Sequence, residues 1–161
     1  KSLTDGVKFA MLRNISSRFK YSCFVNIVEE MELNLYPESQ RSVLFDLLSY
    51  ANKIELNRLV LTTHSPYVIN YLTLAAKAFL LTQKISANET LQERIKEVVP
   101  ADSAIDPARL RIYELKDGGV FRLSTYEGLP SDENFLNIQL GVTNELFDQL
   151  LEIEQEFDYK N

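Results

Sequence analysis

The chain is poor in cysteine, glycine and histidine, and it contains no tryptophan. Its single cysteine, Cys23, permits no internal disulfide and argues against a cysteine-based zinc site. The absence of a disulfide fits a reducing compartment such as the cytoplasm. Because Cys23 precedes the apolar run FVNIV, we predict that it is a small buried side chain. No apolar run approaches the roughly 20 residues that a membrane helix needs, so we expect no membrane partner.

The remaining composition is that of a globular domain. The chain has 161 residues, of which 45% are hydrophobic and 25% are charged, so it is long enough to bury a sizeable core. Its formal net charge of −6 argues against a nucleic-acid-binding surface spread over the whole chain. Binding of nucleic acid through a local basic patch stays an alternative.

The first half of the sequence predicts alternating strands and helices. Short apolar runs rich in β-branched residues predict strands, whereas apolar residues at helical spacing predict helices. The strands are expected at residues 23–28, as a mostly buried strand, and at 58–63. The helices are expected at 7–19, 37–52 and 67–81, with Ser65 as the N-cap of the last. Strand, helix, strand, helix favours an α/β fold with parallel strands, a right-handed crossover and flanking helices.

The second half predicts a different arrangement. Residues 86–99 have the spacing of an amphipathic helix, and residues 100–109 form a turn-rich connector. Strands at 110–115 and 120–125 are joined by KDGG, whose aspartate and glycine suit the positive φ angles of a hairpin turn. After a loop at 127–134, we predict a last helix over residues 144–157.

Polar side chains follow both strands of the first half. Glu29 and Glu30 come directly after the first strand, and His64 follows the second, immediately before a helix. The carboxyl ends of parallel strands are where α/β folds bind ligands. There one carboxylate could hold Mg²⁺ while its neighbour polarises a water, and an imidazole could donate to a phosphate oxygen. The alternatives are that the two carboxylates only begin a solvated loop and that His64 is structural.

Two of these segments together resemble a known family. FVNIVEEMELNLYP, followed about thirty residues later by LVLTTHSP, is similar to the Walker B, D-loop and H-loop segments of AAA-type ATPases related to ABC, SMC and OLD-like proteins. The resemblance implies the C-terminal part of a P-loop ATPase fold, followed by a hairpin and a helix. Residues 1–161 would then be one partial ATPase domain, with the Walker B and H-loop region at 1–81 and a helix–hairpin–helix region at 82–161.

The resemblance also implies roles for individual residues. Glu29 would be the acid that binds Mg²⁺, and Glu30 the general base for the hydrolytic water. His64 would contact the γ-phosphate of ATP, with Thr63 and Ser65 orienting it. Asn34 would lie in the D-loop, which in this family faces the partner subunit of a nucleotide-sandwich homodimer. Met31 stands where the family usually has proline.

One essential motif of such an ATPase is missing. The phosphate-binding loop G-x-x-x-x-G-K-[ST] surrounds the phosphates with backbone N–H groups, and none of the five glycines lies in that pattern. We therefore expect the chain to be the C-terminal half of a longer ATPase that acts in DNA maintenance or phage defence, with DNA or an effector protein as its partner. Alone, it should hydrolyse little or no ATP.

Two other functions need weighing. The main alternative is a noncatalytic interaction module that keeps the ATPase scaffold and binds another protein through its acidic C-terminal helix, although that helix could equally pack on a core with a solvated acidic face. A nuclease is less consistent with the sequence, because Asp102 and Asp106 lie in a turn-rich loop and not at the end of a strand. We interpret these two aspartates as loop-capping acids.

Overall fold

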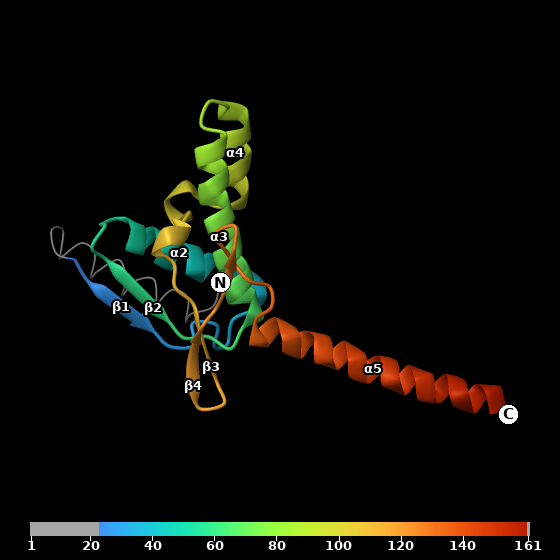
Figure 1. Cartoon of the computed structure of the whole chain (residues 1–161). Coiled ribbons are helices and arrows are strands. Elements are labelled where there is room, and N and C mark those ends of the chain that lie inside the picture. Colours follow the sequence, from blue (N-terminus) through green and yellow to red (C-terminus); the bar gives the residue numbers. More distant parts are fainter. Residues whose placement is uncertain (1–22, 161) are drawn as a thin grey trace. The chain divides into compact units, whose positions relative to one another are not determined.

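The computed structural model describes residues 23–160, so the helix predicted for residues 7–19 lies outside the described residues (Figure 1). Contacts between Cα atoms divide the chain into two compact units, which meet in sequence between Arg109 and Leu110. The first unit is mixed α/β, with a parallel sheet and helices. The second contains two hairpins and one long helix.

The sheet of the first unit consists of β1 (Val25–Val28) and β2 (Arg58–Leu61), paired in parallel as predicted. Both strands are shorter than expected, since β1 begins later and β2 ends earlier. The end of β2 follows from the hydrogen bond that closes the ladder, from the Thr62 N–H to the Val28 carbonyl at 3.1 Å. At the opposite end, the buried Asn57 side chain accepts from the Phe24 N–H at 3.2 Å. The strands therefore end together, and the residues that follow them share one edge.

One face of this sheet is open. Val25 and Ile27 are 63% and 65% exposed, and Val60 on the neighbouring strand is also exposed. The prediction of a mostly buried first strand was therefore wrong, because the described helices cover only one face of the sheet. The prediction of a buried Cys23 was wrong as well, since this residue precedes the point at which the ladder begins and is exposed.

From residue 23 onward, the α-helices of the first unit are α2 (Pro37–Asn52), α3 (Pro66–Lys84) and α4 (Glu89–Val98). The predicted positions are confirmed, although α3 is longer than expected and α4 begins later, where the Asn88 side chain accepts from the Leu91 N–H. The helices α2 and α3 pack against each other, and α4 lies beside α3 (Figure 1). The facing side chains of α2 and α3 form most of the core, which includes Leu44, Leu47, Leu48, Val68, Leu72, Ala75 and Ala76.

The connector after α4 contains two short 3₁₀ helices, Ala101–Ser103 and Pro107–Arg109. The first is fixed to α2, because the buried Ser103 hydroxyl donates to the Phe45 carbonyl at 2.8 Å. As predicted, Asp106 caps a turn, with its carboxylate accepting from the Ala108 N–H at 2.9 Å. The Asp102 carboxylate instead accepts from the Ser49 hydroxyl at 2.8 Å.

The second unit opens with the predicted hairpin, formed by β3 (Tyr113–Lys116) and β4 (Gly119–Arg122). Its two-residue turn has positive φ at Asp117 and Gly118, which is the geometry that closes a tight hairpin. The segment predicted as a loop is a second small hairpin, β5 (Thr125–Tyr126) with β6 (Leu129–Pro130). Its turn has positive φ at Glu127 and Gly128. An E-G pair therefore forms this hairpin turn in place of the more usual D-G pair.

The last helix, α5 (Phe135–Lys160), begins nine residues before the predicted start at Asn144. Its start is fixed by Asn134, whose side chain accepts from the Asn137 N–H at 3.0 Å, while the Glu114 carboxylate accepts from the Phe135 N–H. The predicted start was too late, because the helix extends back through Gly141 to the Asn134 cap. None of the helices in residues 23–160 is long and apolar enough to cross a membrane.

Candidate functional site

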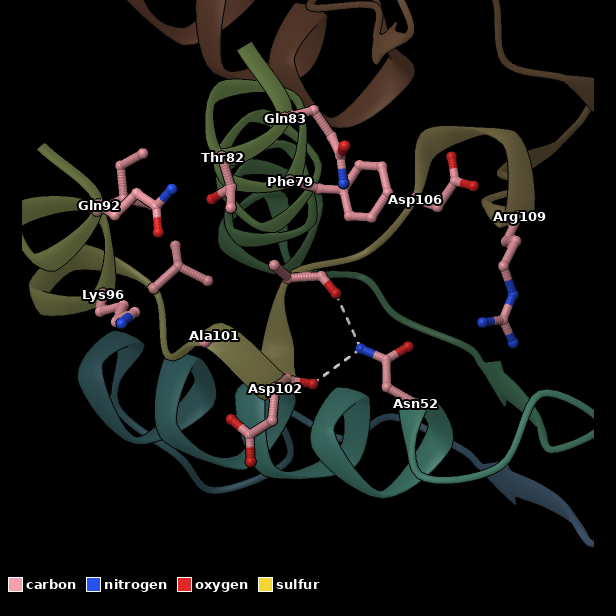
Figure 2. A pocket seen from close by; sticks show the side chains of 13 residues that line it. Asn52, Phe79, Thr82, Gln83, Gln92, Lys96, Ala101, Asp102, Asp106 and Arg109 are labelled. Carbon is pink, nitrogen blue, oxygen red and sulfur yellow. Dashed lines mark hydrogen bonds between the residues drawn. The ribbon is translucent and has the colours of Figure 1, made fainter. Parts of the chain in front are cut away.

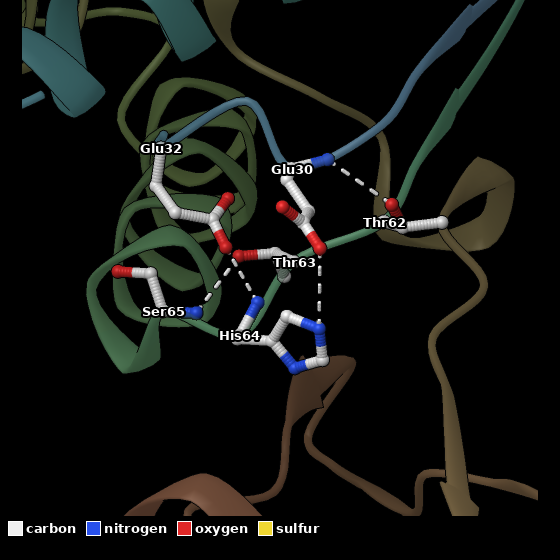
Figure 3. A network of polar contacts seen from close by, with 6 residues as sticks. All are labelled: Glu30, Glu32, Thr62, Thr63, His64 and Ser65. Carbon is white, nitrogen blue, oxygen red and sulfur yellow. Dashed lines mark hydrogen bonds and ion pairs between the residues drawn. The ribbon is translucent and has the colours of Figure 1, made fainter. Parts of the chain in front are cut away.

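The residues after β1 and β2 form a cluster of polar contacts at the carboxyl edge of the parallel sheet (Figure 3). Glu30 and His64 are directed toward each other, with 3.6 Å between Glu30 Oε1 and His64 Nε2. Both side chains are open to solvent, at 49% and 84% exposure. The structure therefore brings together the two candidate catalytic residues predicted from the sequence, and both are accessible to solvent.

The backbone of Glu30 has an unusual conformation. Its φ is 45°, in the left-handed region that residues with a side chain seldom adopt. The conformation is stabilised by a hydrogen bond from the Glu30 N–H to the Thr62 hydroxyl at 3.1 Å. Such residues cluster at functional sites, where the surrounding structure holds a side chain in a defined direction. Here the bend directs the carboxylate toward His64 (Figure 3).

Glu32 also belongs to this cluster, although no sequence motif predicts a role for it. Its Oε1 accepts a hydrogen bond from the backbone N–H of His64, so it connects the turn after β1 with the loop after β2. Its Oε2 is buried, and no donor in the described part of the chain reaches it. A buried carboxylate oxygen without a donor calls for a water, a cation or a further protein group.

Thr63 and Ser65 shape the loop that carries His64. The Thr63 hydroxyl accepts from the Ser65 N–H at 3.0 Å. Ser65 is the N-cap residue of α3, as predicted, but its buried hydroxyl donates to Gln40 Oε1 at 2.6 Å and makes no hydrogen bond to the helix. Gln40 Nε2 in turn donates to the Leu35 carbonyl at 3.0 Å. Gln40 thereby connects this loop with the turn after β1. No local sequence pattern predicts this contact.

Two further candidates lie outside the contact network. Glu29 is exposed, and none of the contacts described for residues 23–160 involves its carboxylate. Asn34 is also exposed and adopts a φ of 60°, ending a double turn in which the Leu33 and Leu35 N–H groups donate to the Glu30 and Glu32 carbonyls. Met31 is completely buried beneath this turn, where it anchors the polypeptide between the acidic residues.

The cluster is strongly acidic. Three glutamates lie within residues 29–32, and neither residues 29–36 nor residues 62–66 contain a lysine or arginine. No group of three metal-binding side chains was found within the part of the chain that the structure describes. Glu29 and the orphaned Glu32 oxygen nevertheless suit a hard cation such as Mg²⁺, which is commonly held by one or two carboxylates together with waters and substrate phosphates.

A separate cavity of about 350 Å³ lies between the end of α2, α3, α4 and the connector (Figure 2). Several of its polar side chains have structural partners. Asn52 donates to the Asp102 and Ala104 carbonyls, and Lys96 is paired with Glu93 at 2.6 Å. Arg109 donates to the Glu55 carbonyl at 3.1 Å. We therefore attribute these polar groups to packing of the connector on α2 and not to ligand binding.

Comparison with protein families matches residues 25–70 to a family described as an AAA domain, putative AbiEii toxin, of a type IV toxin–antitoxin system. The match covers β1, the acidic turn, α2, β2 and the start of α3, which is less than a third of the chain. The match supports an AAA-type, ATPase-like region over these residues. Comparisons with curated proteins and with solved structures gave no match.

Proposed function

We propose that this chain supplies the Walker B and H-loop part of an ATP-hydrolysing site in an AAA-type ATPase related to ABC and SMC proteins. The observation that carries the proposal is the Glu30–His64 pair, 3.6 Å apart at the carboxyl edge of a parallel sheet. The match of residues 25–70 to an AAA family supports the same class of site. The fold and the side-chain chemistry thus both favour the carboxyl edge of the sheet as the place of the ATP-hydrolysing site.

In this proposal Glu30 is the general base. Its carboxylate takes a proton from a water as the water oxygen forms a bond to the γ-phosphorus and the bond between that phosphorus and the bridging oxygen of ADP breaks. In the same proposal, His64 would donate a hydrogen bond to this water or to a γ-phosphate oxygen. Glu32 and Thr62 hold the backbones of the two residues, so the pair keeps its geometry while substrate binds.

The remaining candidates have supporting roles. Glu29 would hold Mg²⁺, which supplies charge neutralisation at the phosphates when it is bound. Thr63 and Ser65 fix the loop of His64 through their backbone and Gln40 contacts. Asn34, which is exposed and has a φ of 60°, would belong to the D-loop and face the partner subunit of a nucleotide-sandwich homodimer.

Two features support a site that is completed by another segment. The acidic cluster offers no cation to the triphosphate, which is the role of the phosphate-binding loop and its lysine. The open apolar face of a two-stranded parallel sheet also needs cover, because parallel sheets in α/β proteins are buried on both faces. We therefore propose that the chain is the C-terminal half of a cytoplasmic ATPase that acts on DNA or an effector protein.

The first test is the coding frame upstream of Lys1. We expect it to encode G-x-x-x-x-G-K-[ST] after an apolar strand, and the protein expressed from the whole frame to hydrolyse ATP with Mg²⁺. A frame that contains no such loop, and a product that binds no ATP, would overturn the proposal. That outcome would favour the noncatalytic interaction module that keeps only the ATPase scaffold.

A further inference from the structure

The helix α5 carries a row of exposed apolar side chains that its own unit leaves uncovered. Ile138, Val142, Leu146, Leu150 and Ile153 follow one another at intervals of three or four residues and therefore share one helix face. We call these five residues the α5 stripe. Each is at least 37% exposed, and Leu150 and Ile153 are 63% and 65% exposed.

The arrangement of the second unit explains why the α5 stripe is open. The first turn of α5 is tied to the rest of the unit through the Glu114 carboxylate of β3 and the Asn134 cap. Beyond that turn the helix extends away from the hairpins of its unit (Figure 1). A long helix with such a face is normally stabilised by packing, and a contiguous exposed apolar surface marks an interaction site.

The charges on α5 restrict what can cover the stripe. Between Phe135 and Tyr159 the sequence has six acidic residues and no lysine or arginine. Among them, Glu145, Glu152 and Glu154 are exposed beside or behind the stripe. Asp148 and Glu152 lie four residues apart on the helix, so their like charges repel each other. A positively charged neighbour would offset this repulsion.

We propose that the α5 stripe binds a basic amphipathic helix of a partner protein. Apolar side chains of that helix would pack on the stripe, and flanking lysines or arginines would pair with the acidic residues, as in heterotypic coiled coils. A second copy of this chain fits less well, because two acidic helices repel each other in either direction. An anionic membrane surface is disfavoured for the same reason, since interfacial helices carry basic polar faces.

A designed peptide tests this surface directly in the 161-residue chain. The probe is a synthetic peptide of about four heptads with leucine at the two core positions and lysine at the flanking positions. We expect measurable binding by isothermal titration calorimetry, weakened by added salt. A peptide of the same composition in scrambled order, and one with glutamate at the flanking positions, should not bind.

Matched variants separate the stripe from general charge. Leu150→Ala keeps helix propensity and should weaken binding of the lysine peptide about tenfold, whereas Leu115→Ala, at an exposed position of β3, should not change it. Glu154→Lys, next to Ile153, should weaken binding severalfold, and Asp148→Lys, on the opposite face, should have a smaller effect. Circular dichroism checks that each variant keeps its helix.

Three outcomes would overturn the proposal. The first is equal binding of the ordered and scrambled peptides, which would indicate nonspecific charge attraction. The second is a self-associated chain in sedimentation equilibrium that Leu150→Ala converts to monomers, which would make a second copy the occupant. The third is the absence of binding to the lysine peptide in a chain whose helix is intact.

Discussion

At the scale of single residues, Glu32 holds the loop that carries His64. Its carboxylate accepts the His64 N–H, and a hydrogen bond to a charged group stabilises a fold more than a neutral one. We predict that Glu32→Ala lowers the free energy of unfolding by about 1 kcal/mol and shifts the His64 amide resonance. Because His64 is the only histidine, its ring signals are directly assigned in an NMR spectrum.

The control for this prediction is Glu55→Ala, which changes an exposed glutamate outside the cluster. It should leave the His64 resonances in place. Unchanged His64 amide and ring signals in the Glu32→Ala protein would show that Glu32 does not position the loop, whatever its effect on stability.

Asp46 on α2 provides a pH-dependent prediction. Partial burial, and secondly the Asp102 carboxylate, raise the pKa of Asp46 above its ordinary value. The folded chain therefore binds this proton more tightly than the unfolded chain, and the free energy of unfolding falls as pH rises from the unfolded pKa through the folded one. Asp46→Asn should be more stable than wild type at neutral pH.

The check is urea unfolding followed by circular dichroism at several pH values. The stability gain of Asp46→Asn should disappear in acid, below the unfolded pKa, where the wild-type carboxyl is protonated in both states. Curves for the two proteins that stay parallel from acid to neutral pH would contradict the assignment.

Single residues also show how far the sequence could predict the site. Glu30 and His64 were predictable because each follows an apolar strand, and parallel strands bring their carboxyl ends to one edge. The positions of Glu32 and Gln40 were not, because their partners lie 32 and 25 residues away and depend on the turn after β1. Ser65 was correctly predicted as the N-cap residue of α3, but the tertiary hydrogen bond of its hydroxyl to Gln40 was not predictable from local sequence.

At the scale of secondary-structure elements, the β3–β4 turn depends on glycine. Gly118 has a φ of 73°, and a Cβ at this position would meet nothing within 4 Å. The cost of Gly118→Ala is therefore conformational, and we predict a loss of about 1 to 2 kcal/mol from the hairpin. Faster hydrogen exchange of the β3 and β4 amides would reveal it.

Gly141 within α5 is the matched control, because it too has open space around its Cβ position but lies in a helix. Gly141→Ala should raise the stability of α5 by about 0.5 to 1 kcal/mol and increase the helical signal. Slower exchange in the hairpin of Gly118→Ala, or reduced helicity of Gly141→Ala, would contradict these assignments.

Element boundaries were less predictable than element types. Strand and helix periodicity located β1, α2, β2 and α3, and the D-G pair located the first hairpin. The second hairpin was missed because β5 and β6 each contain only two residues, too few for an alternating pattern. The early start of α5 depends on the Asn134 and Glu114 contacts, and one of these comes from a different element.

At the scale of the whole molecule, the two units present different kinds of unfinished surface. The first unit exposes an apolar sheet face and an acidic cluster at one sheet edge. The second exposes the α5 stripe. Composition indicated a globular chain but could not reveal these surfaces, because exposure depends on which elements are present to cover a given face. The first surface supports completion of an ATP site, and the second supports a protein partner.

The central claim concerns Glu30, and the most direct measurement is ATP hydrolysis by the protein expressed from the whole coding frame, with Glu30→Gln and Glu55→Gln compared with wild type. Loss of a general base reduces turnover by about 10² to 10⁴, so Glu30→Gln should bind ATP but release phosphate at that much lower rate, while Glu55→Gln matches wild type. A Glu30→Gln protein that hydrolyses ATP at the wild-type rate would contradict the proposed role of this sheet edge.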